Sequence, residues 1–168
     1  MREFEEETPP WQFAFEFDLG LDFAAYVAKV NDWPKGLGIP EGWVPNSYLV
    51  GVVDGKVVGR LSLRHKLNEF LQSYGGHVGY GVVPSERRRG YASEMLRQAL
   101  PICAELGIEQ AIVSCDVDNS ASKKVIEKNG GVFDSTTELL ELDVQKHIYW
   151  IHTATKKNMN AEQARSDA

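Results

Sequence analysis

The sequence has little of what marks several large classes of protein. Its 168 residues include only two cysteines, Cys103 and Cys115, whose spacing matches no zinc or redox motif, so we expect both to be reduced and buried. No apolar run approaches the ~20 residues of a membrane span, and the acidic N-terminus MREFEEETPP lacks the apolar stretch of a signal peptide. The sequence therefore predicts no membrane association and, by default, a cytoplasmic location.

Positive charge is also scarce. The chain has 18 Lys and Arg against 24 Asp and Glu, a net charge of −6, which argues against broad nucleic-acid binding. Of the four histidines, His147 and His152 fall on opposite faces of an expected strand, so we expect no metal site. The length predicts a single domain over residues 1–155 with a flexible polar tail over 156–168.

Helical and strand patterns alternate along the rest of the chain. The periodicity predicts helices over 21–31, 90–106 and 120–129. It predicts strands over 76–83, 110–115, 132–142 and 146–153, and a hairpin of 47–53 with 57–64 around Asp54-Gly55. This order indicates an α/β (α+β) domain with a mixed central sheet of about six strands, flanked by helices. Strands 76–83 and 110–115 are expected to be parallel neighbours across helix 90–106.

One basic stretch interrupts this acidic chain, VPSERRRGYA, from Val83 to Ala92. An isolated run of this kind is more often a solvated surface loop. Here, however, it joins an expected strand to a helix start, where free N–H groups and the helix dipole favour an anion. Gly90 permits close approach of the backbone, and arginines donate to phosphate oxygens. Neither a Walker glycine–Lys–Ser/Thr sequence nor a third Rossmann glycine, whose place is Pro84, is present.

Two motifs in order carry a family resemblance. The pattern Arg87-x-x-Gly90-x-Ala92, followed downstream by the segment 118–131 (DNSASKKVIEKNGG), resembles the cofactor elements of the GNAT N-acetyltransferases. The resemblance covers roughly residues 47–150. The run 64–80 also resembles a subgroup of acetyltransferases whose substrate is unassigned. The resemblance implies a V-shaped splay between the two central parallel strands and acetyl-CoA as cosubstrate, without a metal.

The resemblance also implies cofactor contacts at matching positions. Pantetheine would enter the splay, opened by a bulge that Gly79 and Gly81 favour, and the Val82 amide would polarise the thioester carbonyl. Asn119 matches a residue that contacts the pantetheine arm, and it is equally suited to cap the helix beginning at Ser120. The implied cofactor-binding residues are Tyr80, Gly81, Val82, Arg87, Arg88, Arg89, Gly90, Tyr91, Ala92, Ser93, Asn119 and Ser122.

Catalytic candidates are less clearly marked. His77 is a candidate general base with a suitable pKa, and the alternative is a strand histidine bonded to a neighbour. Tyr80 is a candidate to hold a relay water. The position of the family's usual tyrosine acid is Ile126, so protonation of the thiolate would fall to Ser122, Tyr149 or water.

The acceptor side is expected to carry Arg64, His65 and Asn68, flanked by the loop 36–45 with Trp43. Glu41, Glu69 and Asp116 hint at a cationic acceptor. The sequence thus predicts an N-acetyltransferase acting on a primary amine of a small molecule or peptide. The alternatives are a non-catalytic CoA-binding sensor and an interaction domain that has lost the cofactor.

The beginning of the chain departs from the family pattern. Too few residues precede the helix over 21–31 for the usual first strand and helix. If that strand is missing, the strand near Ser47 lies at an unpaired edge, which invites a homodimer or a substitute strand from 11–17.

Overall fold

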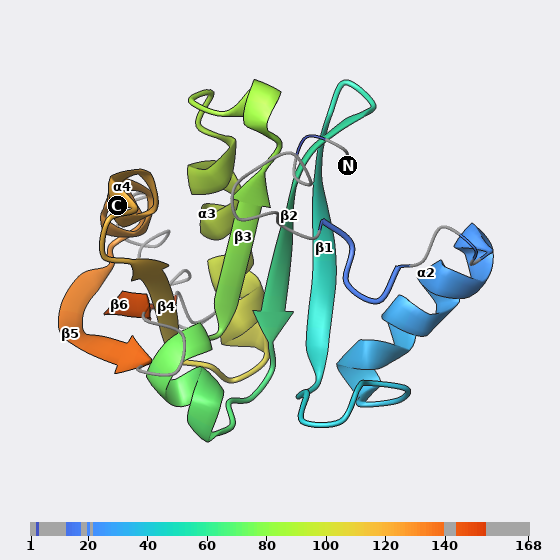
Figure 1. Ribbon diagram of the computed structural model, residues 1–168, viewed down its shortest axis with the longest axis horizontal. Coiled ribbons are helices and arrows are strands. Elements are labelled where there is room, and N and C mark those ends of the chain that lie inside the picture. Colours follow the sequence, from blue (N-terminus) through green and yellow to red (C-terminus); the bar gives the residue numbers. More distant parts are fainter. Residues whose placement is uncertain (1–2, 4–12, 18–19, 21, 140–143, 154–168) are drawn as a thin grey trace, which may run out of the picture.

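The fold is built on one mixed six-stranded sheet flanked by helices (Figure 1). The computed structural model describes residues 3, 13–17, 20, 22–139 and 144–153. In these ranges the strands are β1 (Asn46–Val53), β2 (Lys56–Arg64), β3 (Val78–Val82), β4 (Gln110–Asp116), β5 (Val132–Leu139) and β6 (Val144–His152). The helices are α2 (Phe23–Asp32), α3 (Tyr91–Glu105) and α4 (Ser120–Lys128), with short helical turns η1 (Trp33–Lys35), η2 (Leu71–Gly75) and η3 (Pro84–Glu86).

Local sequence signals place most of these elements as predicted. Asp54 and Gly55 both adopt positive φ (48° and 75°), the conformation that a two-residue hairpin turn requires. Helix α4 begins after the cap Asn119 and is followed by Gly130 at φ 84°. These predictions need only neighbouring residues, which is why the element order could be read from the chain.

The sheet consists of two halves, β1-β2-β3 and β4-β6-β5, with little pairing between them. Its order is β1-β2-β3-β4-β6-β5, and the parallel strands β3 and β4 pair at one position, Val78 with Val113. The predicted splay between them is confirmed, but the predicted bulge at Gly79 or Gly81 is wrong. Strand β3 keeps an unbroken register with β2, and β4 keeps one with β6. The strands therefore diverge because each follows a different partner.

The main core lies between the sheet and helices α3 and α4, with α3 behind the strands in Figure 1. Fully buried side chains from both layers, such as Leu63 and Leu96, contribute about 1.5–3 kcal/mol each relative to exposure. Cys103 and Cys115 are buried free thiols, as predicted. Burial raises the pKa of Cys103 to about 11. This core fixes the positions of α3 and α4 relative to β3.

A second apolar cluster joins α2 and η1 to strand β1. Tyr26, Val30 and Trp33 pack there against Phe15 and Tyr48, among others. Strand β1 lies at the sheet edge, as expected, and its Tyr48 hydroxyl donates to the carbonyl of Phe13. Over 13–17 the chain forms bends and turns, so the substitute strand proposed for 11–17 does not form there; 11 and 12 lie outside the described residues.

Two other predictions concern the ends and surface of the chain. The tail over 156–168 lies outside the described residues, so its flexibility stays a prediction, as does the homodimer. Within the described ranges, no helix combines the length and the apolar character needed to cross a bilayer.

Candidate functional site

Strand β3 presents free backbone donors to the gap in the sheet. The N–H of Val83 donates to the carbonyl of Val58, at 2.9 Å, on the β2 side. Because backbone groups alternate in an antiparallel pair, the groups of Gly81 also face β2, and those of Tyr80 and Val82 face β4. Strand β4 has already diverged at this level. The amides of Tyr80 and Val82 can therefore donate to a ligand in the splay, whereas the Gly81 backbone cannot.

Helix α3 begins without a side-chain cap. Asp22 caps α2 and Asn119 caps α4, but at the start of α3 stands Gly90, with φ 84° and no capping hydrogen bond. Nothing lies within 4 Å of where a Cβ on Gly90 would be. The first-turn N–H groups of Tyr91, Ala92 and Ser93 have no intrahelical partner. The loop and helix start therefore form an open group of donors suited to an anion.

The three arginines of the loop have different surroundings. The Nε of Arg87 donates to the carbonyl of Val82 at 3.1 Å, so this side chain folds back onto β3. Arg89 pairs with Glu86 at 2.9 Å. Arg88 is exposed, has φ 64° and makes no hydrogen bond or ion pair with any residue that the structure describes. Of the three guanidinium groups, that of Arg88 is thus the most available to a phosphate.

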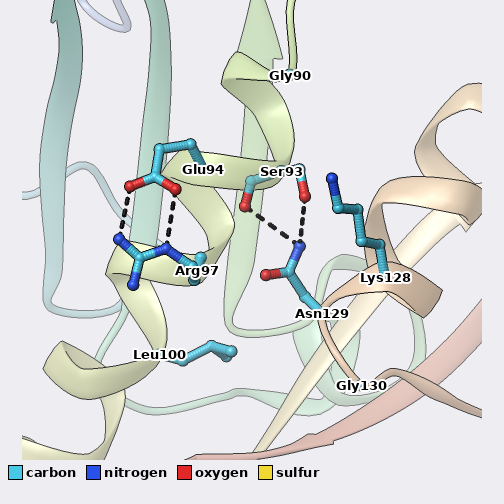
Figure 2. A pocket seen from close by; sticks show the side chains of 8 residues that line it. All are labelled: Gly90, Ser93, Glu94, Arg97, Leu100, Lys128, Asn129 and Gly130. Atoms are coloured by element: carbon cyan, nitrogen blue, oxygen red, sulfur yellow. Dashed lines mark hydrogen bonds and ion pairs between the residues drawn. The ribbon is translucent and has the colours of Figure 1, made fainter.

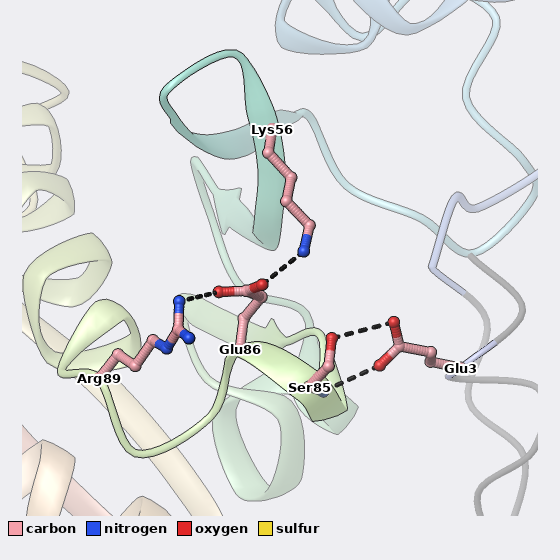
Figure 3. Close-up of polar contacts among 5 residues, drawn as sticks. All are labelled: Glu3, Lys56, Ser85, Glu86 and Arg89. Carbon is pink, nitrogen blue, oxygen red and sulfur yellow. Dashed lines mark hydrogen bonds and ion pairs between the residues drawn. The ribbon is translucent and has the colours of Figure 1, made fainter.

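A buried carboxylate anchors this loop (Figure 3). Glu86 is 6% exposed, and its two oxygens accept from Arg89 and from Lys56 at the β1–β2 turn. The hydrogen bond from Lys56 holds the pKa of Glu86 below its usual value. Ser85 donates from its N–H and hydroxyl to Glu3, at 2.8 and 3.0 Å. The position of the loop is therefore set by contacts distant in sequence, which the motif alone did not reveal.

Two predicted catalytic residues meet on the α4 side of β3. The Tyr80 hydroxyl lies 2.7 Å from the Ser122 hydroxyl and 3.3 Å from the Ser122 carbonyl oxygen. Burial raises the pKa of Tyr80 to about 12, and the hydrogen bond with Ser122 offsets only part of that rise. Tyr80 therefore stays protonated at neutral pH and is suited to donate a proton.

The residues around this pair explain its geometry. Asn119 caps α4 by accepting from the N–H of Ser122 at 2.9 Å, so the capping role considered for it is confirmed. Ile126, at the position of the family's tyrosine, is 0% exposed and packs in the core. The Tyr149 hydroxyl, another candidate acid, is buried without a partner in the described part of the chain.

His77 has a structural bond where a base was predicted. Its ring Nδ1 accepts from the backbone N–H of Ile112 at 2.9 Å, and the backbone N–H of His77 donates to the carbonyl of Ile112. A neutral imidazole has one nitrogen with a free lone pair, and this bond uses it. Burial, together with the nearby charge of Arg64, lowers the pKa of His77 to about 4. This geometry favours the alternative of a histidine bonded to a neighbour, and the role of His77 as a general base stays a prediction.

The other histidines are also held by neighbours. The Nε2 of His65 lies 2.9 Å from the hydroxyl of Ser47, and burial lowers the pKa of His65. His147 bonds with Thr136 on the outer strands. Across the described residues there is no group of three or more side chains placed to bind a metal ion.

A cavity of about 530 Å³ lies between α3 and α4, beside the loop (Figure 2). The amide nitrogen of Asn129 crosses from α4 to the carbonyl and hydroxyl of Ser93, at 3.2 and 3.1 Å. Sequence reasoning missed Lys128 and Asn129, although both stand just before the Gly130-Gly131 that ends α4. The lining residues are Gly90, Ser93, Glu94, Arg97, Leu100, Lys128, Asn129 and Gly130.

A second cavity, of about 260 Å³, lies on the opposite face of β2 and β3; we call it the Arg64 pocket. It contains two of the predicted acceptor-side residues, Arg64 and Asn68, together with Trp43, but not His65. Asn68 donates to the carbonyl of Gly42 and accepts from the N–H of Leu71, so it also joins the loop to η2. The lining residues are Phe15, Gly42, Trp43, Val44, Asn46, Ser62, Arg64, Asn68, Phe70 and Leu71.

Ser62 was missed by the sequence reading of this side. Its hydroxyl is buried and has no hydrogen-bond partner in the ranges that the structure describes. A signal was present in β2, where Arg60, Ser62 and Arg64 alternate with Leu61 and Leu63. Such alternation places the polar side chains on one face of the strand, opposite the main core.

Comparison with known proteins agrees with this geometry. A family model described as an acetyltransferase (GNAT) domain matches residues 22–132. A GNAT-family acetyltransferase from Streptococcus pneumoniae is similar in structure with a TM-score of 0.57 and 13% identity, covering 81% of this chain and 79% of its own. The acetyltransferase yncA from Salmonella typhimurium, solved with acetyl-CoA, gives 0.55 and 13%, covering 84% and 79%.

A spermidine N-acetyltransferase chimera from Vibrio cholerae and hSSAT gives a TM-score of 0.52 and 15% identity, covering 64% of this chain and 68% of its own. No curated protein matches the chain in sequence. At these identities the three solved structures show a shared fold.

Proposed function

Because the chain belongs to the GNAT acetyltransferase family, we propose that it binds acetyl-CoA and transfers the acetyl group to a primary amine of a small molecule or peptide. The observation that carries the proposal is that two groups of backbone donors follow one another along the chain, the first suited to a carbonyl and the second to an anion. Free amides of β3 face the splay, and an uncapped helix start follows on the same segment. A thioester and a pyrophosphate need these two kinds of donor.

The described residues fit acetyl-CoA along its length. The amides from Arg88 to Ser93, with Gly90 open above them, would hold the pyrophosphate. The amides of Tyr80 and Val82 would donate to the pantetheine and to the thioester carbonyl. The cavity beside Gly90, with Lys128 and Asn129, has room for the nucleotide end. Bound acetyl-CoA supplies the activated acetyl group.

In the proposed reaction the neutral amine nitrogen bonds to the carbonyl carbon and the carbon–sulfur bond breaks. The amine loses one proton to solvent, and the departing sulfur gains one. We assign that donation to Tyr80, whose hydroxyl is protonated at neutral pH and is held by Ser122, and Tyr80 then regains a proton from solvent. Positioning of the amine by the protein supplies a further part of the rate. We give His77 no part in this proton transfer because its lone pair is bonded to Ile112.

A second candidate function is a CoA-binding sensor without turnover. The observation that favours it is Ile126, which is fully buried at the position where the family usually has its acid. In the enzyme hypothesis Tyr80, held by Ser122, takes the place of that acid. The two functions differ in one measurable outcome, the release of free thiol.

Two measurements test the proposal. Thermal unfolding with acetyl-CoA at 100 times its Kd should show about 2.7 kcal/mol of stabilisation. Release of free thiol should then rise when a panel of primary amines is added. No stabilisation at excess acetyl-CoA would exclude both cofactor hypotheses, and stabilisation without thiol release on any amine would favour the sensor.

A further inference from the structure

We propose that the Arg64 pocket binds the acetyl acceptor and selects an amine that carries a carboxylate beside an aromatic or large apolar group. This inference rests on the proposed acetyltransferase function. It concerns the substrate class, which the family does not fix.

The first observation is a cation without a counter-charge. Arg64 is mostly buried and pairs with no carboxylate in the described part of the chain. Its Nη1 donates to the carbonyls of Gly75 and Gly76, at 3.2 and 3.4 Å, which orients the guanidinium. Burial lowers the pKa of Arg64 to about 10, so it is charged at pH 7. A buried, oriented and uncompensated guanidinium is suited to a bound carboxylate.

The second observation is a polar cradle at Gly79 of β3. A Cβ built on Gly79 would lie 3.2 Å from the Arg64 Nη1 and 3.6 Å from the Ser62 hydroxyl oxygen. The Ser62 hydroxyl is buried without a partner in the described ranges, and unpaired buried hydroxyls are uncommon in folded proteins. Because Gly79 has no side chain, the donors of Arg64 and Ser62 can converge closely on its backbone.

The walls of the pocket determine the rest of the ligand. Trp43 and Phe70 are 38% and 56% exposed, which is high for residues of their size, and both line the pocket. Phe15 completes the aromatic lining. The described lining residues include no Asp or Glu. A volume of about 260 Å³ is small for a ligand site and limits the occupant to roughly the size of an amino acid.

The pocket lies next to the strand that borders the splay. Gly79 of β3 pairs with Ser62, which lines the pocket, and the adjacent Tyr80 directs its amide into the gap. Because a strand rises about 3.3 Å per residue, the cradle lies about 10 Å from the amide of Val82. A molecule of amino-acid size with its carboxylate on Arg64 can direct its amine toward this opening.

This chemistry differs from the cationic acceptor suggested by the acidic residues. Glu41, Glu69 and Asp116 do not line the Arg64 pocket. Asp116 is instead paired with Lys146 at 2.7 Å. A polyamine would place its charge beside Arg64 with no carboxylate lining the pocket to offset it.

The test first measures binding with a matched ligand pair. 3-Phenylpropionate and 3-phenylpropionamide differ only in charge and hydrogen bonding at one end. We expect the carboxylate to raise the Tm of the full chain and the amide to leave it unchanged, both with and without acetyl-CoA. Equal effects of the two ligands, or no effect of either, would overturn the proposal.

Two variants locate the effect. Arg64→Lys keeps the charge but loses the planar fork, so we expect at least a tenfold loss of carboxylate affinity. Gly79→Ala keeps Arg64 but places a methyl group 3.2 Å from its Nη1, which must shift the guanidinium, and we expect it to abolish carboxylate binding. Both should retain the wild-type affinity for acetyl-CoA, which shows that they fold. Carboxylate binding that survives in both variants would place the ligand elsewhere and contradict the assignment.

Turnover completes the test with L-phenylalanine, L-phenylalaninamide and 2-phenylethylamine. We expect kcat/KM for L-phenylalanine to exceed that for the other two by at least tenfold, and this preference to be lost in Arg64→Lys. Equal or reversed turnover would refute the substrate class but leave the acetyltransferase proposal intact. Failure of acetyl-CoA to bind would instead refute the proposed function. Preferential acetylation of the peptide L-phenylalanylglycine would overturn the limit on size.

Discussion

Gly90 and Gly107 lie at opposite ends of helix α3 and form a matched pair for testing the phosphate loop. Both have positive φ, 84° and 80°, and both have open space where a Cβ would stand. We expect Gly90→Glu to weaken acetyl-CoA binding by at least about 15-fold and Gly107→Glu to leave it unchanged. The two substitutions add the same side chain to the same backbone conformation, so only the location differs.

The cost to stability should be similar for the two variants. A non-glycine residue in the left-handed region costs about 1–2 kcal/mol. For a chain of this length that cost corresponds to a fall in Tm of about 2–8 °C. A Cβ at either position meets no neighbour within 4 Å, so the first side-chain atom adds no packing penalty. Both variants should therefore fold and unfold cooperatively.

The cost to binding should differ between them. A carboxylate at about 5 Å from a phosphate charge is repelled by ~0.8 kcal/mol in water and ~3 kcal/mol at an effective dielectric constant of 20. With two phosphate charges the loss is at least about 1.6 kcal/mol, or roughly 15-fold in Kd. The bulk of the side chain over the first-turn amides increases this loss.

Isothermal titration of acetyl-CoA into the two variants and the wild type provides the measurement. Gly90→Ala serves as a further control, because it has the strain without the charge. A Kd in Gly90→Glu within threefold of the Gly107→Glu value would refute the assignment of this loop to the pyrophosphate.

Two further predictions concern proton transfer and pH. Tyr80→Phe should lower kcat by about 100-fold with little change in the Kd of acetyl-CoA; an unchanged kcat would remove Tyr80 as the acid. His77 has a folded pKa of about 4 against 6.5 for the free side chain, so its contribution to stability is present above pH 6.5 and is lost as pH falls toward 4. Urea unfolding between pH 8 and 4 should show this loss in the wild type and less of it in His77→Asn, and an identical slope would contradict the bonded geometry with Ile112.

Much of the fold follows from short-range patterns. The turn at Asp54-Gly55, the cap at Asn119 and the end of α4 at Gly130 each need only a few neighbouring residues. The splay could also be predicted, but through the family resemblance and for an incorrect reason. No bulge bends β3, because the two halves of the sheet follow different partners.

Only part of the candidate site could be predicted, because short-range patterns can be recognised in the sequence and contacts between distant residues cannot. The loop with Gly90 was found because strand, loop and helix start are contiguous. The hydrogen bonds that hold His77 and Arg87 could not be found in this way. Each joins the side chain to a backbone group whose position only the folded sheet defines.

By itself the sequence determined which segments are helices and strands, and where an anion can meet a helix start, because these depend on neighbours along the chain. Only the tertiary structure decided which side chains work together. It brings Tyr80 to Ser122, 42 residues away, and the donors of Arg64 and Ser62 to the bare backbone of Gly79. The physical reason is that these contacts depend on how the strands pair and which face each side chain occupies, and local propensity specifies neither.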